Sequence, residues 1–141
     1  MKKRVLVILA AVAVVSANFL AFAGQDKPAG KVIAYYFHGT FRCFTCTTME
    51  KYSREAIDAN FKDALASGKL EFKAVNVEER GNEHFVNDYQ LYTKSLILSL
   101  VKAGKEIKSK NLDKIWEYVR NKQRFSDYVT EEVANFLKET Q

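Results

Sequence analysis

Residues 31–46 read KVIAYYFHGTFRCFTC and contain the features that decide the fold. The segment from Lys31 to Phe37 is rich in β-branched and aromatic residues without regular alternation, which is typical of a central strand buried on both faces. Gly39 and Thr40 end this strand, and a short loop then leads to Cys43-Phe44-Thr45-Cys46. The pattern predicts a buried strand followed by a dithiol at the start of the next element.

The elements after the dithiol are predicted from hydrophobic spacing and turn residues. Apolar residues at helical spacing predict a helix from about Cys43 to Ser67, which Gly68 ends as a left-handed cap. Later patterns predict a strand over 70–77, a short helix over 82–89, a hairpin of strands 95–101 and 106–108, and one bent helix or two in series over 112–138. We expect Trp116 and the aromatic residues of the first strand to serve in core or helix packing.

This order of elements predicts the fold class. It requires a right-handed parallel crossover first and a hairpin later. We therefore expect a single α/β domain with a mixed four-stranded sheet, flanked by helices and extended by a C-terminal helical segment. The chain of 141 residues is long enough for one such core and too short for two.

The first 23 residues have the pattern of a secretory signal, with a basic start, an apolar run and a small-residue cleavage site. We expect cleavage after about Ala23, a flexible lead-in over 24–30 and a folded domain over 31–141. The protein would then be periplasmic or secreted. The alternative is a membrane anchor formed by an uncleaved N-terminal segment. The three parts of the signal are Lys2-Lys3-Arg4, Val5 to Val15 and Ala21-Phe22-Ala23.

The charge balance bears on the partners. The whole chain has 22 basic and 17 acidic residues, a net charge of +5. Removing residues 1–23 takes away three basic residues and leaves 19 against 17, a net charge of +2. A nucleic-acid binder would carry a strongly basic surface, so we exclude nucleic acid as a partner. We expect a monomer whose partners are proteins.

Cys43 and Cys46 are the two cysteines of the chain, so within it they can pair with each other alone. The free N–H groups and the dipole at a helix start stabilise a thiolate, which lowers the pKa of Cys43 and makes it the nucleophile. Cys46 lies one turn later and can resolve a mixed disulfide formed at Cys43. A structural disulfide closing so short a loop would contribute roughly 2 kcal/mol, against about 3 for fifteen residues. We therefore interpret the pair as redox-active.

A metal site is the competing interpretation of the same thiols. Two cysteines with His38 and His84 could complete a tetrahedral zinc site, but their spacing is not that of a zinc finger, and His84 belongs to a distant short helix. Cys43, Cys46 and His38 alone could bind a soft ion such as Cu(I). A metal- or metalloid-binding protein is therefore the alternative function.

Two residues near the dithiol have open roles. His38 either transfers a proton to or from Cys46 or is a hydrogen-bonded residue that closes the strand. Arg42 either favours the Cys43 thiolate and contacts a partner, or is a solvated loop residue. We expect Glu50 to pair with Arg54 on the exposed face of the helix.

The strand at 32–37, the dithiol and the long helix resemble the thioredoxin superfamily over about Lys31 to Lys138. Within this region, residues 35–46 look like bacterial proteins labelled the ArsF family, described as a nitrophenyl-compound nitroreductase subunit. The resemblance implies an exported redox partner of protein thiols and disulfides, fed with electrons by a membrane thiol carrier. No residue explains nitro-group reduction and there is no flavin motif, so we expect no cofactor.

The chain departs from the thioredoxin pattern around the dithiol. Arg42 stands where thioredoxins usually have tryptophan, and Phe44-Thr45 where they have glycine-proline. Tyr92-Thr93-Lys94-Ser95 replaces the segment with the cis-proline, and we expect its peptide bonds to be trans because a cis bond without proline costs about 2.5 to 4 kcal/mol. Our hypothesis is that Lys94 faces the dithiol and raises the thiolate content at Cys43. The alternative is that Lys94 points to solvent.

Overall fold

A computed structural model describes residues 30–141. Four strands form one sheet in the order β2-β1-β3-β4. β1 pairs with β2 in parallel and with β3 antiparallel, and β3 pairs with β4 antiparallel. The strands are β1 (Lys31–His38), β2 (Leu70–Asn76), β3 (Ser95–Lys102) and β4 (Lys105–Asn111). The predicted mixed four-stranded sheet is confirmed; the predicted signal segment over 1–23 lies outside the described residues.

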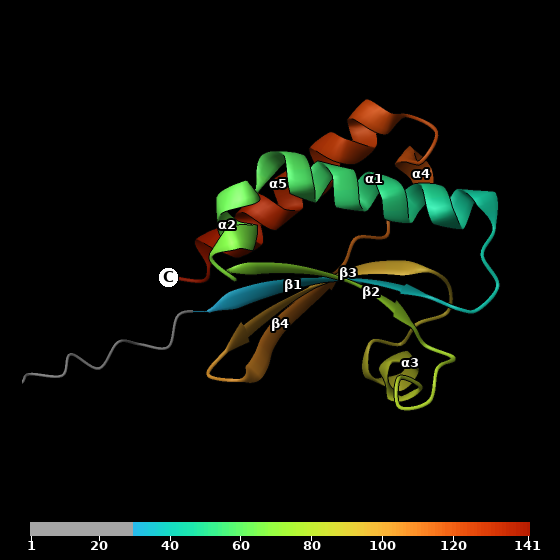
Figure 1. The fold of residues 1–141 in the computed structure, drawn as a ribbon, viewed down its shortest axis with the longest axis horizontal. Coiled ribbons are helices and arrows are strands. Elements are labelled where there is room, and N and C mark those ends of the chain that lie inside the picture. The colour runs from blue at the N-terminus through green and yellow to red at the C-terminus, as the bar shows by residue number, and fades with distance from the viewer. Residues whose placement is uncertain (1–29) are drawn as a thin grey trace, which may run out of the picture.

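The helices cover the sheet unequally. α1, α2, α4 and α5 lie over one face, and the short helix α3 lies on the other side (Figure 1). The helices are α1 (Phe44–Asn60), α2 (Lys62–Ala66), α3 (His84–Asp88), α4 (Ile115–Tyr118) and α5 (Lys122–Lys138). None of them, within residues 30–141, has the length and apolar character that a bilayer crossing requires. The flanking helices and the long C-terminal helix α5 complete the predicted α/β architecture.

Two predicted helical segments are each divided in the structure. The single helix expected over 43–67 is wrong, because α1 ends at Asn60 and is followed by the cap residue Phe61, whose φ of −130° and ψ of 35° are not helical. Phe61 packs against the core, and α2 follows it as a separate short helix. Gly68 follows with a φ of 73°, the left-handed conformation predicted for it. In the C-terminal segment, Asn121 caps α5 by accepting a hydrogen bond from the Arg124 N–H at 3.0 Å, so two helices lie in series.

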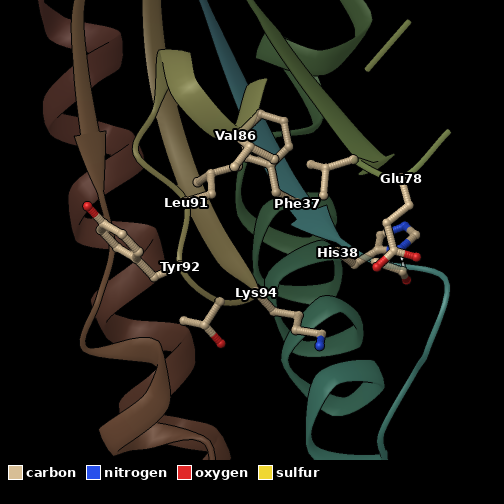
Figure 2. Close-up of a pocket in the computed structure, with 10 residues that line it drawn as sticks. Phe37, His38, Glu78, Val86, Leu91, Tyr92 and Lys94 are labelled. Atoms are coloured by element: carbon tan, nitrogen blue, oxygen red, sulfur yellow. Dashed lines mark hydrogen bonds between the residues drawn. The ribbon is translucent and has the colours of Figure 1, made fainter. Parts of the chain in front are cut away.

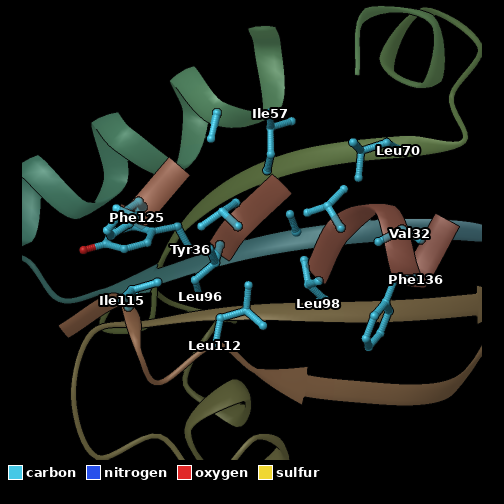
Figure 3. Close-up of a cluster of buried hydrophobic side chains, with 14 of the residues drawn as sticks. Val32, Tyr36, Ile57, Leu70, Leu96, Leu98, Leu112, Ile115, Phe125 and Phe136 are labelled. Atoms are coloured by element: carbon cyan, nitrogen blue, oxygen red, sulfur yellow. The ribbon is translucent and has the colours of Figure 1, made fainter. Parts of the chain in front are cut away.

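The main core lies between the sheet and helices α1 and α5 (Figure 3). Phe125 of α5 is fully buried there, and its ring meets that of Tyr52 edge to face with centroids 5.7 Å apart. The central strand contributes to both faces, since Tyr36 points into this core and Phe37 packs on the other side against Phe85 of α3, with ring centroids 5.1 Å apart. This confirms the prediction that the first strand is buried on both faces.

Trp116 lies outside the buried core. α4 is a single turn, and its buried position is taken by Ile115, while Trp116 remains 40% exposed. The indole N–H of Trp116 donates to the carbonyl oxygen of Lys94 at 3.0 Å. Trp116 therefore links α4 to the segment that precedes β3.

Candidate functional site

The dithiol lies where the loop after β1 meets the first turn of α1. Cys43 is the N-cap residue, with an extended backbone (φ −79°, ψ 160°), and Cys46 lies in the first turn. The two sulfurs form a disulfide, with the Cα atoms 5.0 Å apart. The predicted juxtaposition of strand end, loop, cysteine and helix start is therefore present.

Backbone donors of α1 face the Cys43 sulfur. The Cys46 N–H donates to Cys43 Sγ at 3.1 Å, the contact that a capping side chain makes with a helix start. The first turn of α1 contains no acidic residue, so no carboxylate there offsets the positive end of the helix dipole. In the reduced protein these two features favour a thiolate at Cys43 over the neutral thiol.

The two cysteines differ in exposure. Cys43 is partly exposed, whereas Cys46 is buried, with 1% of its surface accessible. A partner disulfide can therefore reach the Cys43 sulfur, while Cys46 is shielded from solution and lies beside Cys43. This asymmetry agrees with the predicted roles of Cys43 as nucleophile and Cys46 as resolving thiol, which remain predictions.

Tyr36 is a positioning residue, whereas the sequence interpretation assigned it only to core or helix packing. Its buried hydroxyl donates to the carbonyl oxygen of Cys46 at 2.6 Å. Burial raises the pKa of the Tyr36 phenol, so the hydroxyl stays protonated and remains a donor. The bond fixes the first turn of α1 against the central strand. The signal in the sequence was a hydroxyl-bearing aromatic in an otherwise apolar strand, since a buried tyrosine usually has a hydrogen-bond partner.

The Arg42 guanidinium contacts other side chains of the protein. Its guanidinium forms an ion pair with Glu50 of α1, so its charge next to Cys43 is balanced by a carboxylate. The predicted pairing of Glu50 with Arg54 is therefore wrong; Arg54 lies over the ring of Phe72, with its guanidinium carbon 4.5 Å from the ring centroid. The loop that contains Arg42 passes close to α1. The Arg42 guanidinium is therefore paired with Glu50, and Arg54, one helical turn from Glu50, is not.

Both ring nitrogens of His38 have partners. Nδ1 lies 2.9 Å from the carbonyl oxygen of Gly39 and Nε2 lies 3.3 Å from the Arg42 guanidinium. These contacts fit a ring that donates from Nδ1 and accepts at Nε2. His38 is therefore a hydrogen-bonded residue at the end of β1, and its proton transfer with Cys46 remains a prediction.

A cavity of about 180 Å³ lies at the same end of the sheet, and Lys94 lines it together with His38 and Glu78 (Figure 2). The Glu78 carboxylate accepts a hydrogen bond from the Thr40 N–H at 2.9 Å, which lowers the pKa of Glu78, with smaller contributions from Lys94 and His38. A Cβ on Gly39 would lie 2.5 Å from Glu78 Oε1, so a side chain at this position would displace the Glu78 carboxylate.

Neither cysteine lines the cavity that contains Lys94. The effect of Lys94 on the Cys43 thiolate therefore remains a prediction. No peptide bond in residues 30–141 is cis, in agreement with the expectation for the segment before β3.

A metal site is not assembled around the dithiol. Across the described part of the chain, no three His, Cys, Asp or Glu side chains are arranged to hold a metal ion. The sulfurs of Cys43 and Cys46 are bonded to each other, and His38 uses its ring nitrogens as described above. His84 lies on α3 and pairs with Asp88 at 2.7 Å.

No protein-family model and no curated protein sequence matches the chain. Among solved structures, the chain is similar to oxidized thioredoxin O2 from Arabidopsis thaliana, with 11% identity and a TM-score of 0.40 over 68% of this chain and 76% of that one. A thioredoxin from Thermus thermophilus gives 15% identity and a TM-score of 0.39 over 64% and 72%. Thioredoxin from Fasciola hepatica gives 22% and 0.37 over 64% and 79%.

The fold is thioredoxin-like by its own topology. The sheet order, the strand directions and the dithiol at the amino end of α1 are those of the thioredoxin arrangement expected from the sequence. The narrower resemblance to the ArsF family finds no support in the comparisons.

Proposed function

We propose that this protein carries out thiol–disulfide exchange with other proteins through Cys43 and Cys46. One observation carries the proposal: a disulfide at the start of α1 joins a partly exposed cysteine, whose sulfur receives a backbone N–H, to a buried cysteine. An exposed, stabilised thiolate beside a shielded second thiol is the arrangement that exchange requires.

The exchange proceeds in two displacements. In the reduced protein, the Cys43 thiolate attacks one sulfur of a partner disulfide, forms a mixed disulfide and releases the partner's other sulfur as a thiolate. Cys46 then gives up its proton, which the released partner thiolate takes up, and attacks the Cys43 sulfur; this forms the Cys43–Cys46 disulfide and releases the second partner sulfur as a thiolate. Two electrons pass from the protein to its partner, and the reverse sequence oxidises a dithiol partner.

Tyr36 keeps the reacting turn in place during these steps. Its hydrogen bond to the Cys46 carbonyl holds the first turn of α1 against β1 in the oxidised protein. The bond joins a hydroxyl and a backbone oxygen, neither of which changes in the reaction. The turn can therefore keep one position while the sulfurs change partners.

The proposal places this activity outside the cytoplasm. The basic, apolar and small-residue pattern of residues 1–23 supports export, with an uncleaved membrane anchor as the alternative. Oxidising compartments outside the cytoplasm allow a disulfide to persist. The partners are protein thiols and disulfides, and a membrane thiol carrier would supply electrons to a protein that works as a reductant.

The test is to purify the protein without reductant, count its free thiols before and after reduction, and measure bound metal. We expect no free thiols before reduction and two afterwards, no stoichiometric metal, and a reduction potential above about −300 mV, since structural disulfides usually lie below that value. Stoichiometric metal would instead indicate a metal- or metalloid-binding protein. A disulfide that resists all reductants would indicate an adaptor that keeps only the fold.

A further inference from the structure

A groove of about 720 Å³ begins at the residues between the two cysteines. Phe44 and Thr45 line it together with other residues of α1, and Trp116 of α4 lines it with Val119 and Arg120 from the segment after α4. A chain joined to the Cys43 sulfur would therefore have its neighbouring residues at the mouth of this groove. The groove is separate from the cavity that contains Lys94, since the two share no lining residue.

Two of the residues that line the groove are large, apolar and accessible. Phe44 is 86% exposed and Trp116 is 40% exposed. The hydrogen bond from the Trp116 indole to Lys94 fixes that ring at the edge of the groove. Large apolar side chains exposed together are typical of a surface that a partner covers.

The charges that line the groove are all positive. Lys51 and Arg120 line it, and no aspartate or glutamate does. The nearest carboxylate to Lys51 is that of Glu55 at 3.8 Å, and Glu55 is also bound by Lys122 at 2.7 Å, so one negative charge is shared by two lysines. Among the described residues, no carboxylate oxygen lies within 4.0 Å of the Arg120 guanidinium.

We propose that this groove selects protein disulfides that carry an apolar side chain and a carboxylate beside the reacting cysteine. The apolar side chain packs between Phe44 and Trp116, and the carboxylate lies near Lys51 and Arg120. The inference rests on the proposed exchange activity and names the class of partner. Attraction between opposite charges mainly raises the rate of productive encounter, and salt weakens it.

A polypeptide fits this site better than a small disulfide does. Two further large apolar side chains are exposed outside the groove, Phe41, two residues before Cys43, and Tyr92 in the segment before β3. These side chains are 77% and 93% exposed. A partner with several residues on both sides of its cysteine can cover such a surface.

The test uses peptides with one cysteine joined by a disulfide to 2-mercaptoethanol. One peptide has leucine and aspartate beside the cysteine, and its match has leucine and asparagine. The reduced protein is mixed with each, and the exchange rate is followed through the fluorescence of Trp116, the one tryptophan of the chain. Each rate is divided by the rate with dithiothreitol, which removes differences in the peptides' own reactivity.

We expect the aspartate peptide to react about 3- to 10-fold faster at low salt, because two exposed cations each contribute modestly. The ratio should fall toward one at about 0.5 M salt, where charges are screened within a few ångströms. The double variant Lys51→Gln/Arg120→Gln should also give a ratio near one. The control Lys62→Gln/Lys69→Gln removes the same charge around α2, at the far end of α1 from the dithiol, and should keep the preference (Figure 1).

The outcomes separate this inference from the proposed activity. Equal rates for the two peptides, with both clearly faster than an unreactive control protein, would overturn the inference and leave the exchange activity intact. Oxidised glutathione reacting as fast as the aspartate peptide would also overturn it, by showing selection for a small anionic disulfide. No reaction with any disulfide would overturn the exchange activity and the inference together.

Discussion

Replacement of Cys43 with serine is expected to lower the rate of disulfide exchange by more than about a thousandfold. The only other thiol of the chain, Cys46, is 1% exposed, so a partner disulfide cannot reach it from solution. The measurement is the rate at which the reduced variant opens a mixed disulfide under the conditions used for the wild type. Serine is close to cysteine in size, so we expect the variant to fold. Circular dichroism verifies the folded state.

Cys46→Ser is the matched control for this variant. It keeps the attacking sulfur and removes the resolving one, so we expect a mixed disulfide that accumulates at Cys43 and that mass spectrometry identifies. The first displacement should remain fast in this variant. Rapid exchange by Cys43→Ser, or a mixed disulfide trapped on Cys46 in that variant, would contradict the assigned roles.

Phe125→Ala should lower the free energy of unfolding by about 3 to 5 kcal/mol, which is the usual range for removing a buried phenylalanine ring. Phe125 is fully buried between α5 and the sheet and meets Tyr52 of α1, so the truncation leaves a cavity where the two long helices pack. Urea denaturation of the oxidised protein measures the change. Phe125→Leu keeps most of the volume and should cost less, under about 1.5 kcal/mol.

Ile107→Ala is the control for this prediction. Ile107 lies on the edge strand β4 and is 56% exposed, so its truncation should change the free energy of unfolding by no more than about 0.5 kcal/mol. A loss below about 1 kcal/mol for Phe125→Ala, or equal losses for the two variants, would show that the described core does not hold the helices on the sheet.

The fold could be predicted from the sequence where the pattern is local and repeated. The buried strand at 31–38, the hairpin of β3 and β4 and the helical spacing after residue 112 each follow from residue types a few positions apart. The break between α1 and α2 could not be predicted in this way. Phenylalanine as a residue type is compatible with a helix. The non-helical backbone of Phe61 accompanies the packing of its ring against the core.

The dithiol was predictable and its surroundings were not. Cys43 and Cys46 are recognisable by spacing and by the strand before them. The bonds from Tyr36 to Cys46 and from Trp116 to Lys94 join positions 10 and 22 residues apart, and they depend on how the elements meet in space. The pairing of Arg42 with Glu50 likewise arises from the path of the loop across α1.

The central claim is that the amino end of α1 makes the Cys43 thiol ionise readily. Its most direct test is the rate of alkylation of the reduced protein by iodoacetamide as a function of pH, with the modified cysteine identified by mass spectrometry. We expect Cys43 to react first, with a midpoint below about pH 7.5. A midpoint at or above about 8.5, the value of an ordinary thiol, would contradict the claim.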